Sequence, residues 1–467
     1  MPNLYQTKNA LIVLNIFSAM VAFYLGNSSE FPDWLTYWYM SEGLETGKFS
    51  SWFFLESYYP ETIRTPGYPL FLLLLRSISD SQLFIKVIQL LLYFATLFIA
   101  YKTLDKLSNS NILALCVFLF LTALNIQIPY YSGLISSESP SIFLTALFTY
   151  FITTKEKNLR NAIYLGLIGG LLFLMRPAFM LLPFCLLIYF IFIKRTAGKF
   201  ILIHTLIFSF TLIPFSLWNL ENHGVFKPTP IEGAASIAHM GYWNFKLPIN
   251  YREDFQYNAA VIEDATNPIS FSEHERIKYK EKYERDWLVL INSLETHIKP
   301  DEVVAMQEMQ LNNPGIFPIY NSKYTLLREQ YLADLLIEEI KENPIYYLKT
   351  RIYTFIRVYY SGLNIKALKE SPSVIVLFKS VYPFFITFFS IFIGLLIALI
   401  YYLKNRKKID ESFEILLILS LYYGAVSMPF AAQGRYTVPI HFCILIMLSI
   451  MSTKIPMLKR TEKETST

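Results

Sequence analysis

Five charged residues stand where long apolar runs of the sequence begin or end. They are three arginines and two acids: Arg64, Arg176, Arg435, Asp33 and Glu138. An arginine guanidinium keeps its charge and matches a phosphate group through paired hydrogen bonds. A carboxylate beside such a cation can act as a general base toward an alcohol. Because ionisable groups near membrane depth are costly and usually functional, the set predicts a site for a lipid-borne phosphate and a hydroxyl acceptor.

Aromatic and polar side chains occur in the same segments. Tyr37 follows Asp33 by one helical turn, so the two side chains are expected on one helix face. The other residues predicted to line the pocket are Tyr68, Tyr131, Asn222, His223, Gln433 and Tyr436. Aromatic faces suit sugar rings. Together the residues predict glycosyl transfer from a lipid-phosphate sugar to a hydroxyl on the outer side of a membrane.

Each of these residues also has a plainer interpretation. Asp33 can complement the dipole of an interfacial helix, and Glu138 can cap the helix that follows it. Arg176 and Arg435 can snorkel to the membrane interface. Asn222 and His223 can be ordinary loop residues, and the stretch with Arg64 can be a helix cap at the membrane interface. A site is favoured because so many charges on one side of a membrane are hard to explain one by one.

The composition is that of a polytopic membrane protein. Of the 467 residues 54% are hydrophobic and 16% are charged, and the mean hydropathy is +0.37. About ten apolar runs have the length of a membrane span, roughly 17–25 residues, which predicts an all-α fold. These runs are 9–26, 84–101, 111–128, 139–153, 161–175, 178–193, 200–218, 376–402, 412–430 and 437–453.

Basic residues fall in alternate gaps between these runs. They are Lys102 and Lys106; Lys155, Lys157 and Arg160; Lys194, Arg195 and Lys199; Lys404, Arg406, Lys407 and Lys408; Lys454, Lys459 and Arg460. The positive-inside rule places all of them, and both termini, on the cytoplasmic side. The net charge of +5 is thereby explained without a nucleic-acid partner. The same rule makes residues 66–78 either a short helix that dips in from the outer face or the bent start of the next span, after a first outer loop at 27–65.

The longest outward gap predicts a separate, mostly helical outer domain at 221–375, between a core at 1–220 and further spans at 376–467. Within it, Ser272 and Glu275 have the spacing of a capping box at the start of a helix. A second helix is expected from about 323 to 343, followed by an amphipathic helix in the membrane interface.

The three cysteines, Cys116, Cys185 and Cys443, lie inside apolar runs, so neither a disulfide framework nor a metal-ligand spacing is expected.

Several segments resemble a known superfamily. They are "DWLTYWYMSEGLETG", "RTPGYPLFL", "MRPAFMLLP", "LWNLENHGVFKPTPIEGAAS" and "GRYTVPIHF". With them the chain resembles the bacterial GT-C membrane glycosyltransferases, in the branch related to dolichyl-phosphate-mannose protein mannosyltransferases and aminoarabinose transferases. The resemblance implies a GT-C fold, with a core of membrane spans, an outer domain and further spans.

The resemblance also implies a reaction and a location. Asp33 would be the catalytic base, Glu138 a second carboxylate, and Arg64 and Arg435 contacts of the donor phosphate. Arg176 is expected to bind the same phosphate because of its charge and its place at the turn between two spans. The donor would be a polyprenyl-phosphate monosaccharide, and the acceptor a glycan, lipid or protein. Some relatives also use a divalent cation. The protein would lie in the bacterial cytoplasmic membrane among its lipids, with the active site facing the periplasm or exterior.

Two other functions fit parts of the sequence. An O-antigen-type polymerase or ligase would use similar lipids but would transfer a whole glycan from a pyrophosphate carrier. A lipid or solute transporter would show internal repeats and polar groups at the membrane midplane, and the sequence shows no such repeat.

Overall fold

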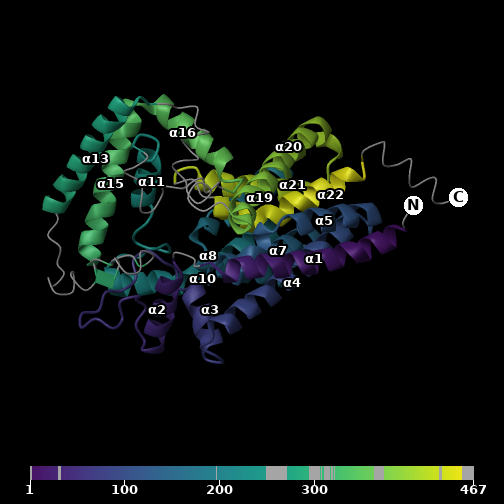
Figure 1. Ribbon diagram of the computed structural model, residues 1–467, viewed down its shortest axis with the longest axis horizontal. Helices are drawn as coiled ribbons and strands as arrows, with labels where there is room; N and C mark the ends of the chain where they lie inside the picture. Colours follow the sequence, from purple (N-terminus) through teal and green to yellow (C-terminus); the bar gives the residue numbers. More distant parts are fainter. Residues whose placement is uncertain are drawn as a thin grey trace.

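The chain is helical over the residues that the computed structural model describes. These residues are 3–29, 33–195, 197–248, 271–293, 306, 308, 309, 316, 319, 321–361, 373–430 and 434–454. No β-strand occurs in these ranges, which confirms the predicted all-α class for them. Figure 1 shows a long bundle of helices with a separate helical lobe at one end. The first helix begins, and the last helix ends, at the other end of the bundle (Figure 1).

Each apolar run predicted as a span lies on helices of the bundle. The earlier runs correspond to α1 (Leu4–Asn27), α4 (Gln82–Leu107), α5 (Ile112–Leu124) with α6 (Gln127–Tyr130), α7 (Glu138–Thr154), α8 (Leu159–Met175), α9 (Leu182–Ile188) with η3 (Tyr189–Lys194), and α10 (Gly198–His223). The later runs correspond to α18 (Val374–Val376), η5 (Leu377–Val381), α19 (Tyr382–Thr387), η6 (Phe388–Ile393), α20 (Gly394–Asn405) and η7 (Arg406–Lys408), then α21 (Glu411–Ser427), and last η8 (Gly434–Ile440) with α22 (His441–Ser452).

Six helices in the described ranges are long and apolar enough to cross a membrane. A seventh candidate is α5 together with α6 and η1 (Tyr131–Gly133), which are bent by 51° at the break between them. The remaining runs form α7, α8 and α21, each of 17 residues. At about 1.5 Å per residue these three helices stand at the lower limit for a span. The protein is therefore a multi-pass membrane protein.

Polar bonds and small residues join the helices of the bundle. Asn15 of α1 is buried and donates to the Leu119 carbonyl of α5 at 2.7 Å, the kind of interhelical bond that polar residues make inside membranes. Gly166 lets α8 approach α10 closely, because a Cβ there would lie 2.7 Å from the Ile207 side chain.

Two short helices lie beside the bundle, near the lobe (Figure 1). They are α2 (Trp34–Glu45), in the predicted first outer loop, and α3 (Gly67–Arg76), in the predicted dip helix. At about 1.5 Å per residue α3 is too short to cross a bilayer. Arg76 joins its end to α2 through ion pairs with Glu42 at 3.5 Å and Glu45 at 3.1 Å.

The lobe contains the helices predicted for the outer domain, although the division into domains stays a prediction. Its helices are α11 (Ala235–Trp243), α13 (Glu273–Ser293), α15 (Ser322–Glu342) and α16 (Pro344–Arg357). The predicted capping box is confirmed, because the Ser272 amide donates to Glu275 at 2.8 Å and the Glu275 amide donates to the Ser272 hydroxyl at 3.3 Å. Buried Lys246 fixes the lobe's interior by pairing with Glu339 at 2.7 Å.

Candidate active site

The structure brings together all five charged residues that were predicted from the sequence. We call Asp33, Arg64, Glu138, Arg176 and Arg435 the arginine–carboxylate cluster. Asp33 Oδ1 lies 3.2 Å from Arg64 Nη2, and Asp33 Oδ2 lies 3.8 Å from Arg435 Nη2. Glu138 Oε1 lies 3.9 Å from Arg435 Nη1 and 3.7 Å from Arg176 Nη1. The ion pairs form a continuous chain in which Arg435 joins the two carboxylates.

Both acids of the cluster stand at the start of a helix. Asp33 directly precedes α2 and Glu138 is the first residue of α7, so both acids lie at helix N-termini, where the helix dipole favours negative charge. Asp33 makes no side-chain hydrogen bond to its own helix end. Its carboxylate faces the arginines instead, so capping alone does not account for it.

A close approach of two helices places two of the arginines. Arg176 directly follows the last residue of α8, and Arg64 lies three residues before Gly67, the first residue of α3. A Cβ at Gly67 would lie 2.5 Å from the carbonyl oxygen of Leu174, so only glycine lets α3 start against the end of α8. This contact explains the glycine in "RTPG" and brings the two arginine-bearing segments together.

Arg64 is positioned by a residue that was not predicted. Glu61 Oε1 accepts hydrogen bonds from the amides of Ile63 at 2.8 Å and Arg64 at 3.0 Å, which fixes the loop before α3. Burial raises the pKa of the Glu61 carboxyl, although Arg64 partly opposes the shift. The sequence signal was an acid three residues before the arginine, a spacing that is too common to be informative.

The cluster is largely buried and carries an excess of positive charge. The side chains of Glu138 and Asp33 are 3% and 10% exposed, while those of Arg64 and Arg435 are 16% and 24% exposed. Three arginines against two carboxylates leave one positive charge. The contacts of 3.7–3.9 Å are longer than hydrogen bonds. The buried atoms Glu138 Oε2 and Arg176 Nη1 have no hydrogen-bond partner within the described part of the chain.

Tyrosines surround the cluster. The Arg64 guanidinium lies 5.7 Å from the centroid of the Tyr37 ring, and Tyr37 packs edge-to-face on Tyr68 at 4.9 Å. Tyr436 lies 5.8 Å from the Arg176 guanidinium and 6.0 Å from that of Arg435. Burial raises the pKa of the Tyr37 phenol, so its hydroxyl stays a hydrogen-bond donor near neutral pH.

Two of the predicted pocket residues, Asn222 and His223, make their described hydrogen bonds outside the cluster. Asn222 donates to the carbonyl of Trp218 in its own helix at 3.0 Å. The ring nitrogens of His223 bond the Ser322 hydroxyl at 2.7 Å and the backbone oxygen of Glu61 at 3.1 Å. His223 thus connects α10, α15 and the Glu61 loop. Gln433 lies outside the described residues.

The segment that carries Arg435 is held by α16 and the turn after it. Arg351 of α16 is buried and donates to the carbonyls of Met428 at 3.0 Å and Pro429 at 2.8 Å. On the other side of Arg435, the Thr437 hydroxyl donates to the carbonyl of Val358 at 2.6 Å. Arg351 therefore has a positioning role, which its amphipathic helix did not reveal in the sequence.

The cluster does not fit a divalent cation. Magnesium and calcium need several oxygen ligands, whereas the carboxylates of Asp33 and Glu138 are interleaved with guanidinium groups. Within the described ranges no group of three or more His, Cys, Asp or Glu residues could hold a metal ion. No step of the mechanism proposed below uses one.

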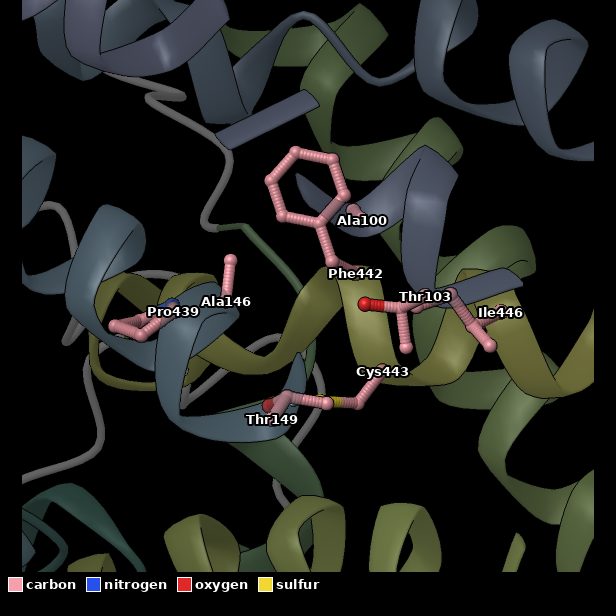
Figure 2. Close-up of a pocket in the computed structure, with 8 residues that line it drawn as sticks. All are labelled: Ala100, Thr103, Ala146, Thr149, Pro439, Phe442, Cys443 and Ile446. Carbon is pink, nitrogen blue, oxygen red and sulfur yellow. Dashed lines mark hydrogen bonds between the residues drawn. The ribbon is translucent and has the colours of Figure 1, made fainter. Parts of the chain in front are cut away.

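Figure 2 shows a small void inside the bundle, away from these charges, where Thr149 of α7 and Cys443 of α22 point toward one another. Its volume is about 10 Å³ and its lining is mainly apolar, with Ala100, Ala146 and Ile446 among the lining residues. About 10–15 Å³ of such volume holds a single water molecule. A sugar cannot enter it, so we treat it as a packing defect.

Comparisons with known proteins find little. No protein-family model matches the sequence, and no curated protein matches it. Among solved structures, the chain is similar to the archaeal oligosaccharyltransferase AglB from Archaeoglobus fulgidus, solved in complex with an inhibitory peptide and a dolichol-phosphate. The sequence identity is 10% and the TM-score is 0.42; the similarity covers 97% of this chain and 52% of AglB. The chain thus spans about half the length of AglB.

Proposed function

We propose that this protein is an inverting GT-C glycosyltransferase. It moves a monosaccharide from a polyprenyl-phosphate donor to a hydroxyl of a glycan, lipid or protein, on the outer face of the bacterial cytoplasmic membrane. The observation that carries the proposal is the arginine–carboxylate cluster, in which a buried acid faces two arginines at the end of a membrane bundle. Its composition suits a reaction that takes a proton from an alcohol and releases a phosphate.

Asp33 acts as the general base in the proposed mechanism. Its carboxylate takes the proton of the acceptor hydroxyl, and that oxygen attacks the anomeric carbon. The bond from the anomeric carbon to the phosphate oxygen breaks, and polyprenyl phosphate leaves with the electron pair. Because the attack comes from the face opposite the leaving group, the anomeric configuration inverts. Arg64 and Arg435 stabilise the charge that develops on the phosphate.

The long ion pairs support this division of roles. Arg176 Nη1 lies 3.7 Å from Glu138 and has no hydrogen-bond partner among the described residues, so a phosphate oxygen can accept from it without breaking a short hydrogen bond. Glu138 keeps both arginines near the site before the donor arrives. Glu138 therefore positions cations in this mechanism, and Asp33 carries out the proton transfer.

Purified full-length protein in lipid vesicles, supplied with synthetic donors, tests the proposal. We expect sugar transfer from a polyprenyl-monophosphate monosaccharide and a product of inverted anomeric configuration, measured by mass spectrometry and NMR. Transfer of a whole glycan from a pyrophosphate carrier, with no use of the monophosphate donor, would support the polymerase or ligase instead. Movement of substrate across the vesicle without any new glycosidic bond would support a transporter.

A further inference from the structure

A cavity of about 90 Å³ adjoins the arginine–carboxylate cluster. About 10–15 Å³ of such volume holds one water molecule, so several waters or one phosphate group fit inside. Tyr131 of η1 belongs to both sites: it lines the cavity, and its phenol interacts electrostatically with Glu138, Arg435 and Arg176. The cavity is thus next to the proposed active site but is lined by different charged residues.

Lys379 is the cation of this cavity. Its ammonium group donates to the hydroxyls of Ser28 at 3.1 Å and Ser29 at 2.7 Å, just beyond the end of α1. No carboxylate lies within ion-pair distance of it in the described ranges, which do not include Glu30. Apolar side chains of Leu25 and Phe378 complete this side of the cavity. Both hydroxyls donate in turn to the Leu25 carbonyl at 3.0 Å, so the remaining ammonium proton of Lys379, at the edge of apolar walls, is the donor that suits the phosphate end of a lipid.

Gln127 adds a second, independent feature. Its side-chain amide donates to the Ser361 hydroxyl at 3.4 Å, while its side-chain oxygen is buried without a hydrogen-bond partner among the described residues. Gln127 is 8% exposed and lines the same cavity. A buried acceptor needs a donor. A phosphomonoester supplies one as P–OH in its monoanionic form, which a second pKa of about 6 keeps partly populated near neutral pH, whereas a phosphodiester has no such proton.

The wall between α1 and η1 is preformed. A Cβ at Gly133 would lie 2.6 Å from the amide nitrogen of Asn27, so the end of α1 packs directly on the backbone of η1. This packing fixes Ser28 and Ser29 relative to Tyr131. The cavity therefore needs little rearrangement to receive a ligand.

We propose that the Lys379 cavity binds the phosphate of a lipid phosphomonoester. The identity of that lipid rests on the proposed function: the sugar donor is a phosphodiester, and the polyprenyl phosphate that leaves the cluster is a monoester. The cavity is then the site to which polyprenyl phosphate moves after the reaction. Lys379 takes the phosphate charge, and Gln127 accepts a hydrogen bond from the P–OH that forms when the leaving phosphate takes up a proton from water.

Native mass spectrometry of the full-length protein, titrated with a short polyprenyl phosphate, tests the site. We expect two bound lipids per chain for the wild type and one for Lys379→Gln, a loss of about tenfold or more in affinity at one site. Lys379→Arg, which keeps a cation, restores the second lipid and excludes misfolding. Lys404→Gln, at the other end of the same candidate span, is the matched control and keeps both lipids.

The same binding assay with other lipids and a second variant shows which kind of phosphate the cavity selects. Phosphatidylglycerol, a phosphodiester, is expected to leave the second site empty, and Gln127→Leu is expected to weaken polyprenyl phosphate there. Two lipids bound to Lys379→Gln would overturn the site. Equal occupancy by phosphatidic acid would overturn the role in product release. The binding assay measures no sugar transfer. A second site that fails to bind lipid therefore leaves the proposed glycosyl transfer untouched, and a failed transfer assay leaves lipid binding at the Lys379 cavity untouched.

Discussion

Arg64→Ala is the substitution whose consequences the structure defines most completely. Arg64 Nη2 lies 3.2 Å from Asp33, and its guanidinium covers the Tyr37 ring. Burial opposes the charge of Arg64, but the carboxylate of Asp33, the phenol of Tyr37 and the carboxylate of Glu61 together raise its pKa above the ordinary value. The cation is therefore held firmly beside the acid.

The effect on activity is expected to exceed the effect on folding. At 3.2 Å and an effective dielectric constant near 20, the gross attraction between the two charges is about 5 kcal/mol. Removing one partner of a buried pair costs roughly 3–5 kcal/mol of stability, and Asp33 keeps Arg435 at 3.8 Å, so we expect a loss at the lower end. Loss of a preorganised cationic group at a developing anion lowers kcat by about 10²–10³-fold.

Steady-state transfer assays in vesicles measure this effect, with KM for the lipid donor and kcat determined separately. Arg64→Lys keeps the charge without the paired hydrogen bonds and is expected to fall between wild type and Arg64→Ala. Arg160→Ala removes an exposed arginine outside the cluster and is the control. Unchanged KM and unchanged kcat for Arg64→Ala would refute the assignment of Arg64 to the donor phosphate.

Two further predictions concern residues outside the cluster. Arg351→Ala removes the hydrogen bonds to the carbonyls of Met428 and Pro429 and lets the segment with Arg435 move. The KM for the lipid donor is therefore expected to rise by about tenfold. An unchanged KM would show that α16 does not position Arg435. Burial lowers the pKa of His239 in the lobe to about 4, and Glu339 partly opposes the shift. Because the unfolded chain binds this proton near pH 6.5, the stability that neutral His239 contributes is complete above pH 6.5 and is lost as the pH falls toward 4, by about 3 kcal/mol. His239→Phe keeps the stacking on Tyr283 and is expected to flatten the pH dependence of thermal unfolding over that range; an unchanged pH profile would contradict the shift.

Local patterns were the part of the fold that could be predicted. The apolar runs lie on helices because a long apolar segment in a membrane must satisfy its own backbone. The dip helix could be separated from the full spans because positive charges alternate around it. The capping box of Ser272 and Glu275 depends on four consecutive residues and needs no tertiary information.

The sequence could show which residues belong to the site, but not how they are paired in space. The five charged residues stand out because they lie at the predicted outer ends of the apolar runs, away from the basic clusters at the other ends, and the structure gathers all five. Which acid faces which arginine depends on the approach of α3 to α8, which no local pattern encodes. Glu61 and Arg351 were missed because their partners are backbone groups, and backbone groups leave no mark in the sequence. His223 was predicted for the pocket, yet its partners are Glu61 and Ser322, far away in the chain.

The single-turnover rate of Asp33→Asn tests the central claim most directly. The variant keeps the shape of the side chain, and Glu45→Gln removes an acid from the same helix outside the cluster as a control. With vesicles preloaded with a polyprenyl-phosphate monosaccharide, the rate of sugar transfer is predicted to fall by about 10²–10⁴-fold while donor affinity stays within about threefold of wild type. Transfer by Asp33→Asn at a rate near that of wild type would contradict the claim that Asp33 is the catalytic base.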